Sequence, residues 1–208
     1  MKQKTRQLWQ KQDQHQGDRW RLFSAVSRAL TIEHVFYPGS YVDIAPSFVF
    51  PAVTYLDADK RAAAFFADRE GVLAIIKEYP GSPKSPALSF LHSDYTEKLP
   101  LPLGTFDLLV SLYAGLISEH CIEYLTVGGY LLANPSHGDV AMASLDPRYE
   151  LVGAIMSEQG AYSVKTTDLE TFLIPKRPES LAIDKIRATC RGIAYTKSAF
   201  AYLFQRVS

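Results

Sequence analysis

Residues 99–111 read LPLPLGTFDLLVS, and this stretch decides how the rest of the chain is interpreted. The run 106–110 is mostly apolar, which is typical of a parallel strand that is buried on both faces. Further along, residues 117–125 have the pattern of a helix that stops near Gly128 and Gly129, and residues 130–133 form another apolar strand. A strand, a helix and a second strand in this order predict a right-handed crossover in a parallel sheet.

The chain before this stretch repeats the same alternation. Strands are predicted over residues 34–37, 52–56 and 87–91, because each run is rich in β-branched and aromatic residues and two of them end at turn formers. A helix follows Asp59, a good N-cap residue, and a second helix covers 72–79 before a loop rich in Pro, Ser and Gly. The pattern favours an α/β domain.

The pattern changes after residue 134. Strand-like runs cover 149–156 and 169–174, a helix fits 179–191, and residues 199–207 alternate apolar and polar positions as a final strand. We expect these strands to form an antiparallel hairpin attached to the parallel sheet.

The first thirty residues differ in charge from the rest. They hold seven Lys and Arg against two acids, a net charge of +5 that the remaining chain balances with −5. We expect a polar, frayed segment followed by an amphipathic helix over 18–30, which gives a basic helical arm (1–30) and one domain (31–208). The arm either covers an active site or contacts an acidic partner, or its charges are simply solvated; the last is favoured, because charge runs usually face solvent.

Composition excludes several classes of protein. Hydrophobic residues make up 47% of the 208, enough for a core, and 22 Lys and Arg balance 22 Asp and Glu. Zero net charge argues against nucleic acid as a partner, because phosphate binding needs a basic face. The sequence has no run of about 18 apolar residues, so no membrane span is predicted. Its first residues lack the apolar segment of a secretory signal. Cys121 and Cys190 are far apart, as expected of a cytoplasmic protein without disulfides. The oligomeric state is not predicted.

Three segments together resemble a known family. They are His92–Tyr95, the stretch 99–111 quoted above, and LTVGGYLL at 125–132. In this order and spacing they resemble class I S-adenosylmethionine-dependent methyltransferases over about residues 30–135. The resemblance implies a Rossmann-like, seven-stranded, mostly parallel sheet with an antiparallel C-terminal strand and helices on both faces. It also implies S-adenosylmethionine as the cofactor.

The resemblance further assigns residues to the cofactor. An acid after the second strand would accept the ribose hydroxyl protons, and an acid after the third would lie at the adenine amine. The loop after the first strand would approach the cofactor, and the end of the fourth would lie near the reacting centre. The residues that match these positions are Tyr37, Gly39, Ser40, Asp57, Ala58, Asp94, Tyr95 and Ser111. For Asp57 and Asp94, loop or N-cap roles are equally supported.

The first motif departs from the family pattern. Only Gly39 matches a glycine of the usual Gly-x-Gly-x-Gly run, and Tyr41 stands where the second glycine is expected. Glycine is used there because the backbone must approach the ligand without a Cβ. Pro46 starts a short helix and Pro51 ends it, so the first crossover is short. Asp43 either replaces the missing acid of this motif or, as we favour, forms a turn before Pro46.

The candidate catalytic residues follow the fourth and fifth predicted strands. His137 is a candidate general base, and Tyr113 a candidate wall of the acceptor pocket. The alternatives are a polar turn around His137, which is favoured, and a core position for Tyr113. His137 and Asp139 lack a third ligand, so no metal site is predicted. Cys121 is expected to be buried and unreactive.

The sequence therefore leads to two functional hypotheses. The first is methyl transfer from S-adenosylmethionine to a small molecule or a protein. No Asn/Asp-Pro-Pro-Tyr run follows the fourth strand, which argues against methylation of nucleobase amines. The alternative is a catalytically inactive methyltransferase-like module that serves binding or assembly, which the missing glycines support. A different nucleotide-using enzyme ranks last, because no Walker or dinucleotide glycine motif is present.

Overall fold

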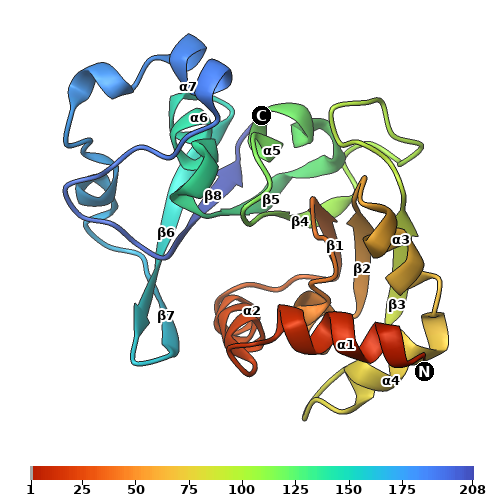
Figure 1. Ribbon diagram of the computed structural model, residues 1–208. Helices are drawn as coiled ribbons and strands as arrows, with labels where there is room; N and C mark the ends of the chain where they lie inside the picture. Colours follow the sequence, from red (N-terminus) through yellow and green to blue (C-terminus); the bar gives the residue numbers. More distant parts are fainter. Residues whose placement is uncertain (1) are drawn as a thin grey trace. The chain divides into compact units, whose positions relative to one another are not determined.

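A computed structural model describes residues 2–208, which divide into two compact units, one ending at Leu99 and the other spanning Pro100–Ser208. The first unit carries all the parallel strands that precede the stretch 99–111 (Figure 1). Its elements are α1 (Gln3–Gln12), α2 (Asp18–Ala29), β1 (His34–Pro38), the 3-10 turn η1 (Ala45–Phe48), β2 (Ala52–Leu56), α3 (Lys60–Phe66), α4 (Arg69–Lys77) and β3 (Ala87–Leu91).

The three strands of the first unit are parallel and lie in the order β3-β2-β1. The apolar side chains of β1 and most of those of β2 are buried, Val35 and Tyr55 completely so, whereas β3 buries only Leu88. The predicted N-cap of α3 is confirmed, because the Asp59 carboxylate accepts the Arg61 amide at 2.7 Å. The short first crossover is also confirmed: Pro46 lies in η1, and the chain turns into β2 directly after Pro51.

The prediction of a frayed segment before Asp18 is wrong for residues 3–12, which form α1 (Figure 1). Its Trp9 ring is only 6% exposed and meets Phe48 and Tyr79 edge-on, and those two rings stack with centroids 3.7 Å apart. Asp68 accepts hydrogen bonds at 2.7 Å from the Lys2 amide and from the Thr5 hydroxyl. One buried indole and one capping carboxylate therefore hold a helix whose composition is mostly polar.

The second unit begins with the stretch that opened the sequence analysis. Its elements are β4 (Phe106–Ser111), α5 (Ile117–His120), η2 (Ile122–Tyr124), β5 (Leu125–Ala133), η3 (Pro135–His137), α6 (Asp139–Leu145), β6 (Tyr149–Glu158), β7 (Ala161–Lys165), η4 (Leu169–Leu173), η5 (Pro178–Ser180), α7 (Ile183–Thr189) and β8 (Ala201–Arg206).

The strands of the second unit lie in the order β4-β5-β8-β6-β7. The pair β4–β5 is parallel, and β8 runs antiparallel to both β5 and β6, which confirms the antiparallel C-terminal strand. Residues 2–208 hold eight strands, one more than predicted. The additional strand is β7, a five-residue edge strand that pairs with β6 across a turn at Gln159 and Gly160, both with positive φ. Such a short alternating run is difficult to recognise without its partner.

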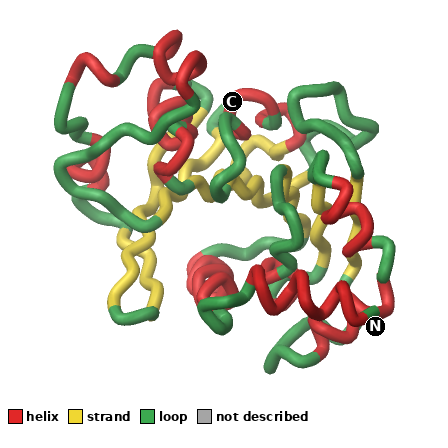
Figure 2. Tube along the Cα trace, in the orientation of Figure 1, coloured by secondary structure: helices red, strands yellow, loops and turns green. Residues whose placement is uncertain are grey.

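Four further predictions for the second unit need correction. Residues 169–174 are 3-10 turn rather than strand, and Gly128 and Gly129 lie inside β5 rather than before it. The helix predicted over 117–125 is one turn of α5 followed by η2. The helix predicted over 179–191 is confined to α7, which is flanked by loops. Figure 2 shows the consequence: the long connection between β7 and β8 is mostly loop with short helical pieces.

Candidate functional site

In the first unit, the loops after β1 and β2 are tied together at the carboxyl ends of these strands. The amides of Gly39 and Ser40 donate to the Leu56 carbonyl at 2.8 and 3.3 Å. Gly39 and Tyr41 both have positive φ (65° and 48°), so the chain turns sharply around Ser40. In open α/β sheets, ligands bind at the carboxyl ends of the parallel strands. The loop after β1 lies at such an end.

Asp57 is the acid that joins the two loops. One carboxylate oxygen accepts the Tyr41 amide and the other accepts the Asp59 amide, each at 2.7 Å. Each carboxylate oxygen has two lone pairs, so both can accept one further proton from a ligand. Asp57 therefore holds the loop in shape and keeps acceptor capacity at the strand end. Next to it, the Ala58 carbonyl lies 3.0 Å from Nε2 of His92.

Ser40 supplies the most direct indication of a ligand in this unit. Its side chain is 2% exposed, and its hydroxyl has no hydrogen-bond partner within the part of the chain that the structure describes. An unsatisfied buried hydroxyl costs free energy on the order of 1–3 kcal/mol, so such groups are uncommon unless something else binds them. The Ser40 hydroxyl therefore has unused hydrogen-bonding capacity that a ligand or a water molecule would satisfy.

Other predicted residues of the first unit lie differently. The Tyr37 side chain turns into the core, where its hydroxyl donates to Asp43 at 3.1 Å. Asp43 also accepts the Ala45 amide at 3.1 Å and lies 3.7 Å from Arg19, so the turn before Pro46 is confirmed for this acid. Burial raises the pKa of Asp43, and the neighbouring Arg19 opposes that rise.

After β3, Asp94 is an exposed turn residue. One oxygen of its carboxylate accepts the amide and the hydroxyl of Thr96 at 2.9 and 2.8 Å. Tyr95 beside it is half-buried. At the rim of the β1 loop, the Arg61 guanidinium lies over the Tyr41 ring, 5.2 Å from its centroid. The residue that replaces the second glycine is thus covered by a cation from α3.

In the second unit, the end of β4 leads into a buried polar cluster that the sequence did not predict. The Ser111 and Ser118 hydroxyls both donate to the Asp139 carboxylate, and the Ser118 amide lies 3.1 Å from both of its oxygens. Asp139 is 1% exposed, and burial raises its pKa to about 6 against the opposing effect of these hydrogen bonds. The hydroxyl proton of Ser111 is donated to Asp139 within this cluster. These hydrogen bonds stabilise the turn after β4.

The candidate catalytic residues lie on a neighbouring part of the second unit. Asn134 directly follows β5, and its side-chain oxygen accepts the Tyr113 amide at 3.3 Å and the Ser136 hydroxyl at 2.8 Å. The Ser136 oxygen lies 2.7 Å from Nδ1 of His137. The Ser136 hydroxyl donates its one proton to Asn134, so its contact with His137 fits the neutral tautomer that carries the ring proton on Nδ1. In that tautomer Nε2 has the lone pair that a general base needs.

Tyr113 and Asn134 line an open hollow in the second unit. Tyr113 has a φ of +62° and is 51% exposed, so it is not a core residue. The opposite wall comes from the segment before β8, including Gly192, Ile193 and Phe200. From the sequence, Asn134 was only part of the polar turn expected around His137; the available signal was its position at the end of an apolar strand.

Two further groups complete the description. Cys121 is buried, as predicted, and burial holds the pKa of its thiol well above the ordinary range. No cluster of three or more His, Cys, Asp and Glu suited to a metal lies within residues 2–208. In the same range no helix is both long enough and apolar enough to span a membrane.

No family model matches the sequence, and no curated protein matches it. Solved structures do resemble the fold. A chain from the complex between the Trm112 methyltransferase activator of Haloferax volcanii and a protein named as a methyltransferase aligns with 14% identity and a TM-score of 0.50, covering 100% of this chain and 99% of that one.

Two other structures align less completely. N-methyltransferase NodS of Bradyrhizobium japonicum, solved with S-adenosyl-L-homocysteine, aligns with 12% identity and a TM-score of 0.46, covering 70% of this chain and 81% of that one. A protein of Methanococcus maripaludis named as an S-adenosyl-L-methionine-dependent methyltransferase aligns with 15% identity and a TM-score of 0.43, covering 56% of this chain. This chain covers only 55% of that protein.

The alignment over the full length establishes the class to which the fold belongs. The chain has the α/β, Rossmann-like fold of class I methyltransferases, with parallel strands first and antiparallel strands last. Activity, substrate and partner do not follow from a fold at this identity.

Proposed function

We propose that the protein transfers a methyl group from S-adenosylmethionine to a small-molecule or protein acceptor. The observation that carries the proposal is the Ser40 hydroxyl, buried and unpartnered in the loop after β1, beside the Asp57 carboxylate with acceptor capacity left. A cofactor with ribose hydroxyls and an amino-acid tail presents the donors and acceptors that such groups bind.

The roles of the residues follow from their chemistry. Asp57 would accept protons from the ribose hydroxyls, while Gly39 and Ser40 would bind the cofactor through the loop after β1. Asp94 and Tyr95 would bind the adenine. The cofactor supplies an already activated methyl group, so the protein's main task is to position an acceptor. In the second unit, Nε2 of His137 would take the acceptor's proton, and Tyr113 would line the acceptor hollow.

Ser40→Ala separates a binding role from a structural one. If the hydroxyl is only an unsatisfied core group, its removal leaves stability unchanged or raises it and leaves binding unchanged. We expect stability to be kept and the Kd for S-adenosylmethionine to rise by about five- to tenfold, the loss of roughly one hydrogen bond. Calorimetric titration of the full chain with S-adenosylmethionine and S-adenosylhomocysteine measures the binding, and urea unfolding measures the stability.

Asp57→Ala and Asp57→Asn extend the same titration. The alanine variant loses the acceptors of two backbone amides as well as the ribose contact, so we expect no measurable binding. Asn keeps one acceptor oxygen and should bind weakly. Asp59→Ala is the matched control, because Asp59 lies in the same loop but caps α3. Unchanged affinity in Asp57→Ala would remove this acid from the cofactor site.

One observation favours a second candidate function, a module that binds without catalysis. Tyr41 stands at the position where the family pattern has a glycine that lets the backbone approach the ligand, and Arg61 covers its ring. Folded wild-type protein that binds neither S-adenosylmethionine nor S-adenosylhomocysteine at millimolar concentration would favour this function and exclude methyl transfer.

A further inference from the structure

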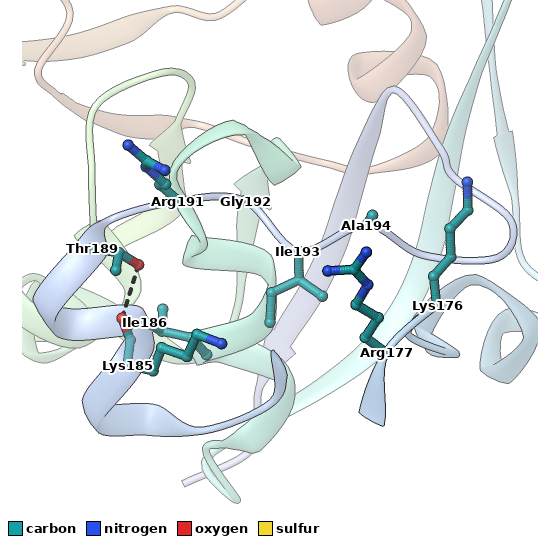
Figure 3. Close-up of a pocket in the computed structure, with 9 residues that line it drawn as sticks. All are labelled: Lys176, Arg177, Lys185, Ile186, Thr189, Arg191, Gly192, Ile193 and Ala194. Carbon is teal, nitrogen blue, oxygen red and sulfur yellow. Dashed lines mark hydrogen bonds between the residues drawn. The ribbon is translucent and has the colours of Figure 1, made fainter. Parts of the chain in front are cut away.

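The second unit contains a pocket of about 440 Å³ whose charged side chains are all cations. It lies between the segment before η5 and the segment from α7 to the strand β8, and none of the described residues that line it is an acid. Two isoleucines, both buried, form its apolar part. Figure 3 shows the residues on which the argument rests: Lys176, Arg177, Lys185, Ile186, Arg191 and Ile193.

Two cations approach the pocket from different segments of the chain. Figure 3 shows Lys185 on α7 and Arg177 before η5 on either side of Ile193, with their charged ends directed toward the space between them. Lys176 and Arg191 stand at the two ends of the pocket and extend away from its centre. The Thr189 hydroxyl donates to the Lys185 carbonyl at 2.8 Å, which stabilises the end of α7 that carries Lys185.

The charges around this pocket are unlike those in the rest of the unit. Residues 100–208 hold nine Lys and Arg against eleven Asp and Glu, yet residues 171–197 hold six Lys and Arg against two acids. Three other cations of the unit pair with carboxylates: Arg187 with Glu119, Arg148 with Asp146, and Lys165 with Asp168. Among the described residues no carboxylate pairs with Lys176, Lys185 or Arg191. Gathering like charges is unfavourable unless an anion compensates them.

The pocket shares a wall with the hollow at Tyr113 and Asn134. Gly192, Ile193 and Ala194 line both. The Gly192 amide donates to the Ser136 carbonyl at 3.0 Å, and a Cβ on Gly192 would lie 2.0 Å from the Pro135 carbonyl oxygen. On the other side, the Lys176 amide donates to the Ala194 carbonyl at 2.8 Å. A single backbone segment, residues 192–194, therefore separates the cationic pocket from the loop that carries His137. We call this segment the strap.

We propose that the cationic pocket binds the phosphoryl group of the methyl acceptor, a small phosphorylated molecule whose reacting group lies in the hollow on the other side of the strap. This inference rests on the proposed methyl transfer. A phosphoryl group fits better than a carboxylate because it carries up to two negative charges and three acceptor oxygens. The guanidinium fork of Arg177 matches two of those oxygens, while Lys185 supplies a point charge.

The pocket is tested first without the cofactor, with inorganic phosphate as the probe. Thermal unfolding of the full chain is followed in phosphate and in chloride at equal ionic strength and pH. We expect phosphate to raise the Tm of wild type, and the concentration needed to rise tenfold or more in Arg177→Gln/Lys185→Gln. Lys84→Gln, an exposed lysine of the first unit, is the control and should respond as wild type does. A Tm that is equal in phosphate and chloride, or an equal response in the double variant, overturns the proposal.

The assignment to the acceptor is tested by methyl transfer. The protein is incubated with methyl-labelled S-adenosylmethionine and a cell extract filtered to remove macromolecules, either untreated or treated with phosphatase. We expect labelled product only from the untreated filtrate, and at least tenfold less with the double variant. The RNA and protein retained by the filter are tested in a separate reaction. Equal labelling of the two filtrates, or labelling only of this retained fraction, overturns the assignment.

Cofactor calorimetry and the phosphate response test different proposals, so failure of methyl transfer can be told apart from failure of the phosphorylated acceptor. If S-adenosylmethionine does not bind in calorimetry, methyl transfer fails, while the phosphate response of the pocket is still measured on its own. If the cofactor binds and phosphate does not, the methyl-transfer proposal stands and the acceptor class falls.

Discussion

Asp139 is the acid whose environment is most unusual at the scale of single residues. In the folded protein burial raises its pKa to about 6, and in the unfolded chain the ordinary value near 3.8 applies. Below pH 4 both states hold the proton. Between about pH 4 and 6 the unfolded chain releases its proton while the folded protein keeps it, so this group makes folding less favourable as pH rises. Above pH 6 the penalty is complete, about 3 kcal/mol for a shift of this size.

We therefore expect Asp139→Asn to remove this pH dependence. Asn is neutral at every pH and keeps an oxygen to accept from Ser118. The free energy of unfolding of wild type minus that of Asp139→Asn should fall by up to about 3 kcal/mol between pH 4 and 7. Urea denaturation at closely spaced pH values measures it. A difference that does not change with pH would contradict the assignment of a raised pKa to this carboxyl.

Asp146→Asn is the matched control, because the same linkage acts on it with opposite sign. The hydrogen bonds from Arg148 lower the pKa of the Asp146 carboxyl. Its contribution to stability is therefore present above the unfolded pKa and is lost as pH falls through the folded pKa. The free energy of unfolding of wild type minus that of Asp146→Asn should therefore rise with pH, whereas the corresponding difference for Asp139→Asn falls.

Single residues also show how far the sequence alone reaches. Asp57 and Asp94 were singled out from the sequence because each follows a predicted apolar strand, and strand position is readable from periodicity. Their present partners were not found, because the Tyr41 amide that binds Asp57 lies 16 positions earlier in the chain. The cluster of Ser111, Ser118 and Asp139 was missed for the same reason: three common polar residues become a buried unit only when β4, α5 and α6 meet.

At the scale of elements, α1 depends on one aromatic side chain. Trp9 is buried against Phe48 and Tyr79, while the neighbouring Gln10 of the same helix is exposed. We expect Trp9→Ala to lower the free energy of unfolding by about 3 kcal/mol and Gln10→Ala to change it by less than about 0.5 kcal/mol. Denaturant unfolding measures both, and hydrogen exchange of the α1 amides should accelerate only in Trp9→Ala. Equal exchange in the two variants would show that the indole does not hold the helix.

The same helix explains why some elements were predicted and others were not. Strands β1 to β4 were predicted almost to the residue, because each is a run of mostly apolar residues, and β1 and β4 are buried along most of their length. Helix α1 has only two buried residues among ten, so its pattern carried no signal before its contacts with Phe48, Asp68 and Tyr79 were known. Helix α6, five of whose seven residues are buried, was missed because the turn formers of 134–138 directly precede it.

At the scale of the whole molecule, stability is distributed unevenly along the chain. The connection from Lys165 to β8 is mostly exposed, and its α7 buries a single residue, Ile186. It is held at few points: the buried Phe172 and Tyr195, and the strap at Gly192. The basic segment at the start of the chain, by contrast, is held by the Asp68 hydrogen bonds and the Trp9 contacts. Local opening should therefore occur first in the connection before β8.

Limited proteolysis with trypsin measures this order. Both regions offer lysines and arginines, so the first cut reports which backbone opens more readily rather than which has a site. We expect the first cuts after Lys185, Arg187 or Arg191, identified by mass spectrometry of the nicked chain. Cuts after Lys11, Arg19 or Arg21 should appear several-fold more slowly in wild type and approach the rate of the first cuts in Trp9→Ala. First cuts in α1 or α2 of the wild-type protein would show that the basic arm, and not the strap beside the cationic pocket, is the less stable part of the chain.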